Sequence, residues 1–363
     1  PIWFALALLT ADGISTDLSA ASETLRYGLR DLSNAYGSRL TGHGIGGLLL
    51  LVLLLFLRRN PTVTSRIGES ATRRVLDHPI AATVVLTLAF TQPLYPTAQP
   101  SVVALNTAIF ISAELILLGA ALQRIGFGKL SLAGAYLIAM TAVYLVPFNT
   151  PLYRVALLIG ALGGIGLLFE TRRLVTQRLE RSRWRPAVRF LLHTFSALLM
   201  LAVVANVIGA ITFTSFIVQA VIRCYLAAIG LLTLSLVLRD LSDGVLDTRV
   251  LRSLRSIQKS RTSVSLLLRK TIAVAAVLLW LWAATNAFGL LEPILSAVQR
   301  VLAASWTVGQ VTVSLGTILI FALSIWLAVY VSRVTRFFVD EDVLPRLDLP
   351  RGVPATISTS MHY

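Results

Sequence analysis

Charged residues, and acidic ones above all, are scarce in this sequence. Only 13% of the 363 residues are charged, with 17 Asp and Glu against 32 Lys and Arg, whereas a soluble globular protein carries about 25% charge. Hydrophobic residues make up 56%. This composition excludes an ordinary cytoplasmic enzyme, a disordered tail and a DNA-binding domain. It predicts that lipid surrounds most of the protein surface.

Residues that would build a metal centre or a catalytic site are also scarce. The single cysteine, Cys224, excludes an intramolecular disulfide and a cysteine-based metal cluster. The four histidines lie far apart, and there is no HExxH, Walker or dinucleotide-binding motif. His193 and Ser196 are three residues apart, but nothing else indicates a nucleophile with its base. We therefore predict no enzyme activity, no catalytic residue, no metal ligand, no cofactor and no nucleic-acid partner.

Long apolar runs are what the sequence has in abundance. Each is near the ~20 residues that a helix needs to cross a bilayer, and open sheet edges cannot persist in hydrocarbon. The sequence therefore predicts an all-α polytopic membrane protein with about nine transmembrane helices, at 41–57, 79–98, 102–122, 130–148, 151–169, 187–209, 213–238, 271–291 and 309–331.

Two further segments, 17–37 and 292–306, carry apolar residues at three- and four-residue spacing and charged residues opposite them. Such a helix can lie in the headgroup plane of a membrane. We interpret both as interfacial amphipathic helices on the outer side. The alternative, that each packs on neighbouring protein, stays open.

The basic residues indicate one orientation. Alternate connections hold 26 of the 32 Lys and Arg, while the intervening ones hold only Arg154 and Arg300, and the N-terminal flank holds three. Because Lys and Arg favour the cytoplasmic side, the N-terminus is predicted outside and the C-terminus in the cytoplasm. The connections with the 26 basic residues are 58–78, 123–129, 170–189, 239–270 and 332–351.

Two charged residues lie near the middle of predicted spans. Glu114 and Arg223 have opposite charge and similar depth, and burying either alone is costly. We interpret them as a candidate ion pair that is either a lock between two helices or a proton-sensitive site. Alternatively, Arg223 extends toward the interface and Glu114 is protonated or faces a wet crevice. The polar residues within spans are expected to form interhelical hydrogen bonds: Asn106, Asn206, Gln219 and Asn286.

The inner connection 239–270 contains a run of basic residues that can form a helix along the inner leaflet. Anionic lipid attracts such a helix by roughly 1 kcal/mol per basic residue. The alternative is an ordinary positively charged cytoplasmic loop. The candidate lipid contacts are Arg249, Arg252, Arg255, Lys259 and Arg261.

The last part of the chain shows a more specific pattern. An apolar helix, 309–331, is followed by a basic extension with Phe337, a charged turn, and a segment rich in small and hydroxyl residues, 356–363. With its string LPRLDLPRGVPATIS, this part resembles the start of the channel module of the small-conductance mechanosensitive channel (MscS) superfamily, in the large MscK-like branch. The resemblance implies a tension-coupling turn formed by Arg333, Arg336, Asp340, Glu341, Asp342, Arg346, Asp348 and Arg351.

The resemblance implies a homoheptamer in the bacterial inner membrane, with a periplasmic N-terminus and ions passing through an axial pore. It divides the chain into an extracytoplasmic or interfacial segment, 1–40, sensor helices within 41–308, and the start of the channel module, 309–363. The pore helix is expected beyond these residues. The implied function is to sense membrane tension through lipid contacts and to release ions and osmolytes on hypo-osmotic shock.

Two other functions remain open from the sequence. One is a secondary transporter with Glu114 and Arg223 at its binding site. The other is a membrane-embedded transferase, which would use acidic residues at 240–247 or 340–342.

Overall fold

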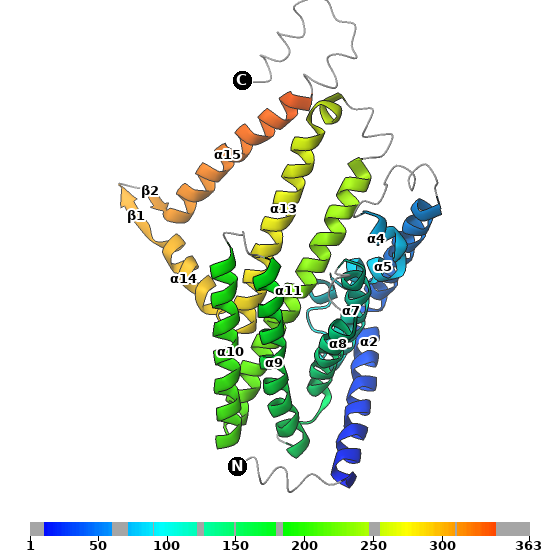
Figure 1. Cartoon of the computed structure of the whole chain (residues 1–363). Coiled ribbons are helices and arrows are strands. Elements are labelled where there is room, and N and C mark those ends of the chain that lie inside the picture. Colours follow the sequence, from blue (N-terminus) through cyan, green and yellow to red (C-terminus); the bar gives the residue numbers. More distant parts are fainter. Residues whose placement is uncertain are drawn as a thin grey trace, which may run out of the picture. The chain divides into compact units, whose positions relative to one another are not determined.

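The computed structural model describes residues 11–59, 72–89, 91–121, 127–148, 150–178, 184–246, 255–308 and 311–338. Nearly all of these residues are helical (Figure 1). The chain divides into two compact units. The first comprises Pro1–Asp240 and Ala275–Phe288, and the second comprises Leu241–Val274 and Gly289–Tyr363.

The first unit is a bundle of helices. Proline is the first residue of α5, α7 and α9, where an N–H would have no partner within the helix. The elements that contribute to this unit are α2 (Ala11–Arg59), α4 (Thr72–Asp77), α5 (Pro79–Leu88), α6 (Thr91–Leu94), α7 (Pro100–Ala121), α8 (Phe127–Ala142), the 3-10 helix η1 (Val143–Leu145), α9 (Pro151–Arg178), α10 (Arg185–Ile208), α11 (Ile211–Leu246) and the end of α13 (Arg255–Ala287).

Among the described residues, seven helices are long and apolar enough to cross a membrane. They coincide with seven of the predicted spans and confirm a polytopic helical architecture. The other two predicted spans, 79–98 and 130–148, hold the shorter helices α5, α6 and α8. A proline follows the last helical turn of each of these two segments. Pro96 follows α6 and cannot continue it, and Pro147 favours the extended conformation of Val146, φ −78° and ψ 132°.

Helix α2 is kinked close to the end of the predicted amphipathic segment 17–37. Tyr36 has non-helical backbone angles, φ −132° and ψ 22°. Its hydroxyl forms a 2.5 Å hydrogen bond with Thr97, and Ser101 donates to the Thr24 carbonyl at 3.3 Å. Segment 17–37 therefore packs on the start of α7, as the alternative interpretation expects. Its contact with lipid headgroups stays a prediction.

The buried core of the first unit lies where α9, α10 and α11 meet. Leu157, Leu199 and Val218, one from each helix, are almost completely buried. The last part of α13 joins this core, because the Trp280 indole donates a 3.0 Å hydrogen bond to the Cys224 carbonyl. These contacts fix the helices that carry the polar residues described below.

The second unit contains a β-hairpin across the end of one predicted helix, 292–306, and the start of the next, 309–331. The prediction that 292–306 is helical throughout is wrong in its last residues, and the final span begins at Leu315, later than the predicted residue 309. Threonine and valine fill most of both strands, and such β-branched residues favour strands. The elements are α14 (Leu291–Ala303), the antiparallel strands β1 (Ser305–Val308) and β2 (Val311–Ser314), and α15 (Leu315–Phe338).

Backbone and capping bonds connect α14 to α15. The Leu315 N–H donates to the Ala304 carbonyl at 3.1 Å. The Ser314 hydroxyl accepts a hydrogen bond from the Thr317 N–H at 3.1 Å and so caps α15. The end of α14 and the start of α15 are therefore held together at the hairpin.

Gly163 of α9 allows the Tyr136 ring of α8 to approach the α9 backbone closely. A Cβ added at Gly163 would lie 2.6 Å from the Tyr136 ring, whereas one added at Gly166 meets nothing within 4 Å. We expect Gly163→Ala to destabilise the protein by about 1–3 kcal/mol through overpacking. We expect Gly166→Ala to leave stability unchanged or slightly raised, because alanine favours helix. Thermal unfolding followed by circular dichroism measures both, and equal midpoints would contradict this packing.

Candidate functional site

Arg154 is a buried cation near the start of α9, and only 9% of the residue is exposed. Its Nη2 donates to the Asn206 carbonyl oxygen at 2.7 Å, and the Asn206 side-chain amide donates to the Arg154 carbonyl at 3.3 Å. Helix α10 ends at Ile208, and Gly209 closes it with a left-handed backbone, φ 108°. Arg154 thus stabilises the carbonyl end of α10, where the helix dipole favours a cation.

A second polar cluster joins α9 to α11. The hydroxyl groups of Tyr153 and Ser215 are 2.6 Å apart and hydrogen-bonded. The Gln219 amide donates to both of them, at 3.2 Å and 3.1 Å. The prediction of interhelical hydrogen bonds is confirmed for Asn206 and Gln219, while the bonds of Asn106 and Asn286 stay predictions.

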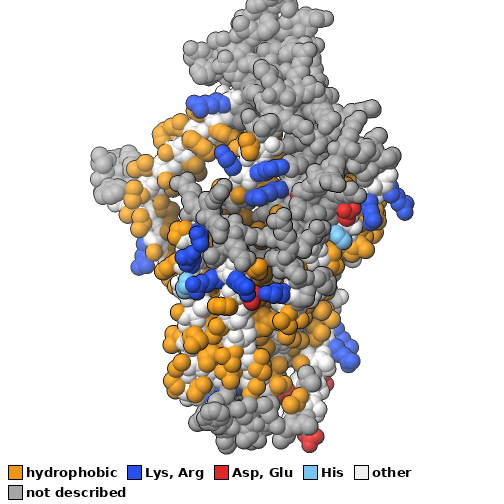
Figure 2. Space-filling model, in the orientation of Figure 1, with side chains coloured by type: hydrophobic (Ala, Val, Ile, Leu, Met, Phe, Trp, Pro, Cys, Tyr) orange, Lys and Arg blue, Asp and Glu red, His pale blue; other side chains and the backbone are white. Residues whose placement is uncertain are grey.

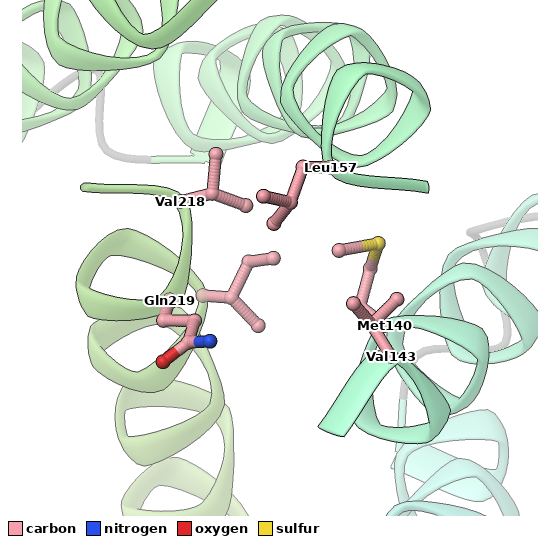
Figure 3. A pocket seen from close by; sticks show the side chains of 6 residues that line it. Met140, Val143, Leu157, Val218 and Gln219 are labelled. Atoms are coloured by element: carbon pink, nitrogen blue, oxygen red, sulfur yellow. The ribbon is translucent and has the colours of Figure 1, made fainter. Parts of the chain in front are cut away.

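A small cavity adjoins this cluster. Its side chains converge from α8, η1, α9 and α11 (Figure 3). Its volume of about 10 Å³ suits roughly one water molecule, and an organic solute would not fit. The lining residues are Met140, Val143, Leu157, Val218, Gln219 and Ile222.

Glu114 carries a carboxyl group into the interior between α7 and α11. The residue is 2% exposed. A Cβ added at Gly230 would lie 3.3 Å from Glu114 Oε1 and 3.1 Å from the Phe110 ring, so the two helices approach closely here. The carboxyl is within hydrogen-bonding reach of the Thr233 hydroxyl. Oε1 itself has no hydrogen-bond partner among the residues that the structure describes.

The predicted partner of Glu114 lies in different surroundings. Arg223 is on an exposed face of α11, seven residues before Gly230. Seven residues correspond to about 10.5 Å along a helix. The Glu114 carboxyl faces Gly230 and Thr233, two residues that carry no signal in the sequence by which they could have been singled out. The ion pair of Glu114 with Arg223 stays a prediction.

Only the first two residues of the predicted tension-coupling turn, Arg333 and Arg336, lie in the part of the chain that the structure describes. Arg333 is exposed near the end of α15, and Arg336 lies in the last turn of that helix. Six of the predicted residues lie outside the described part of the chain: Asp340, Glu341, Asp342, Arg346, Asp348 and Arg351.

Of the five predicted contacts with the inner leaflet, three lie on described residues and two do not. Arg255, Lys259 and Arg261 lie on the first turns of α13, which agrees with a helix in this basic segment. Arg249 and Arg252 lie outside the described residues. Their contact with lipid stays a prediction.

The described part of the chain assembles no recognisable catalytic group. The His193 ring bonds the Arg189 carbonyl, and the Ser196 hydroxyl donates to the Leu192 carbonyl, each within its own helix. The described residues contain no group of three or more His, Cys, Asp or Glu that could hold a metal ion. The interhelical polar contacts include those of Arg154 with Asn206 and of Tyr153 with Ser215 and Gln219.

Apolar side chains cover the outside of the bundle. Figure 2 shows them over the lower part of the molecule, with Lys and Arg side chains gathered along the upper edge of this belt. On α10, for example, Val204, Val207 and Ile208 are all exposed. An apolar belt bounded by cations is typical of a protein that lies in lipid.

Arg154 and Arg300 are the two basic residues of the proposed outer connections, which makes them a matched pair for a test. Arg154→Met leaves the buried Asn206 carbonyl without its guanidinium donor, and we expect a loss of about 1–3 kcal/mol. Arg300 is exposed, and we expect Arg300→Met to be nearly neutral. Thermal unfolding in one detergent measures both. Equal midpoints for the two variants would contradict a stabilising role of Arg154.

The chain was compared with known proteins in three ways. No family model matches it, and neither a curated protein nor a solved structure is significantly similar to it.

Proposed function

We propose that this chain is the tension-sensing membrane region of a mechanosensitive ion channel that resembles the MscS superfamily, in its MscK-like branch. The channel opens when the bilayer is stretched and releases ions and osmolytes on hypo-osmotic shock. The observation that supports this most directly is the exposure of the last apolar helices. In the apolar windows of α13 and α15, no residue is buried.

Exposed apolar helices are suited to respond to bilayer thickness. Stretching thins the bilayer and changes its mismatch with each helix, at fractions of a kcal/mol per Å. A ligand or a force shifts a two-state equilibrium only by its differential effect on the two states. The small mismatch energies of several lipid-facing helices therefore sum to a free energy that shifts the equilibrium between the closed and open states.

Helix α14 is the proposed contact with the outer leaflet. It has no buried residue, and Ile294, Leu295, Val298 and Val301 form an exposed apolar stripe. In the proposal this stripe lies among the headgroups. The backbone bonds at the hairpin pass a displacement of α14 on to α15. The basic end of α15 and the turn that follows it then transmit the displacement to the pore of a homoheptamer.

We further propose nine spans, with a periplasmic N-terminus and a cytoplasmic C-terminus in the bacterial inner membrane. Because Arg154 is buried against α10, its charge is used within the protein. Of the two basic residues in the proposed outer connections, only Arg300 then remains as a surface charge. Helices α5 and α8, with 10 and 16 residues, reach about 15 and 24 Å, and α6 and η1 extend these two crossings.

A second candidate function is a secondary transporter. The buried carboxyl of Glu114 favours it, because ionisable residues inside membrane proteins mark substrate or proton pathways. The cavity beside Gln219 argues against an organic substrate at that place, because it holds about one water molecule. Glu114→Gln should abolish solute transport if this candidate is right. Under the channel proposal it changes gating or stability only.

Patch-clamp recording of the full-length polypeptide in liposomes tests the proposal. We expect suction on the patch to activate a current, because tension favours the state with the larger membrane area. A protein that inserts correctly and gives no pressure-activated current would overturn it.

The proposed role of α14 gives a sharper prediction. Val298→Asp places a charge in the apolar stripe and weakens insertion among the headgroups. We expect a higher threshold pressure for opening. Gln299→Asp changes the adjacent exposed position outside the stripe and should leave the threshold near that of the unmodified protein. Patch-clamp recording with a channel of known threshold in the same patch measures both, and equal thresholds would exclude this role of α14.

A further inference from the structure

The Glu114 carboxyl sits where an ionised group would have little to stabilise it. Glu114 lies near the middle of α7 and is 2% exposed. Phe110 and Gly230 crowd the side of Oε1, which has no hydrogen-bond partner among the described residues. A buried carboxylate without partners is strongly disfavoured relative to the neutral acid.

Among the described residues, Thr233 is the hydrogen-bonding group placed at the carboxyl, and it has already used its proton. The Thr233 hydroxyl donates to the Ile229 carbonyl of its own helix at 3.1 Å. A threonine hydroxyl has one proton and two lone pairs. Only the lone pairs are then free to point toward Glu114, so a hydrogen bond between the two side chains needs a proton on the carboxyl.

Charged groups that could stabilise an ionised Glu114 are distant along the helices that pack around it. On α11, Arg223 precedes Gly230 by seven residues, and Arg239 follows Thr233 by six. Helix α5 has no charged side chain, and on α8 Lys129 pairs with Glu170 at 3.3 Å. The remaining ionisable groups on α8 and α11 are Tyr136 of α8 and Cys224, Tyr225, Asp240 and Asp243 of α11. On α2, which also packs on α7, Asp31 and Tyr36 bond Gln99 and Thr97, which precede the first residue of α7.

We propose that Glu114 is a proton-binding site inside the bundle, and that its neutral carboxylic acid donates to Thr233 Oγ1 and joins α7 to α11. The proton comes from water and is held on the carboxyl. Ionisation would require the Thr233 hydroxyl to turn its proton away from Ile229, or would leave the charge without a donor. This site does not depend on the proposed channel function.

Infrared spectroscopy of the full chain in liposomes tests the site without any activity. At neutral pH, we expect the difference spectrum between the unmodified protein and Glu114→Gln to contain a carboxylic-acid C=O stretching band. Glu170→Gln, at a half-exposed and ion-paired carboxylate, should leave that band in place. Identical spectra for the unmodified protein and Glu114→Gln in this region would overturn the proposal.

Thr233→Val tests the partner and remains informative if Glu114→Gln does not fold. Valine has a shape similar to that of threonine but has no acceptor. We expect the acid band to move to higher frequency, because its O–H loses its acceptor. An acid band that keeps its frequency in Thr233→Val would overturn the proposed hydrogen bond from Glu114 to Thr233, and a spectrum without any acid band would overturn the proton-binding site itself.

Discussion

Polar groups that leave water must find their partners inside the protein, and this constraint organises the central helices of the chain. Arg154 and Asn206 bond each other across α9 and α10, and Tyr153 and Gln219 do the same across α9 and α11. Each bond replaces one that water would otherwise supply. The three helices are thereby fixed around a common core, which gives the rest of the first unit a stable support.

The last helices follow a different principle. The apolar windows of α13 and α15 have no buried residue, and α14 has none either. The connection between α14 and α15 is local, through the hairpin and the cap at Ser314, while the end of α13 also bonds the core of the first unit through Trp280. A chain that combines a packed, hydrogen-bonded bundle with exposed apolar helices has a part that resists deformation and a part that lipid can act on. This contrast is the physical basis of the proposed function.

The sequence predicted those features that local chemistry decides. Apolar runs located seven long helices, Pro96 and Pro147 follow the ends of the two shorter segments, and the kink at Tyr36 falls at the end of the amphipathic segment. Contacts between helices were not predictable in the same way. Arg154 was counted with a connection, although it folds back onto α10, and Thr233 opposite Glu114 looks like any threonine in an apolar helix. The hairpin was missed because its β-branched residues continue an apolar run.

The central claim is that lipid forces move the exposed helices while the hydrogen-bonded bundle keeps its form. Pulsed electron resonance between spin labels tests this in bilayers of decreasing thickness, and the only native cysteine, Cys224, is buried. The account predicts a constant distance between labels at Gly166 of α9 and Met200 of α10. It predicts a changing distance between Met200 and Gln299 of α14. If both distances stay constant as the bilayer thins, or if the first changes as much as the second, the account is contradicted.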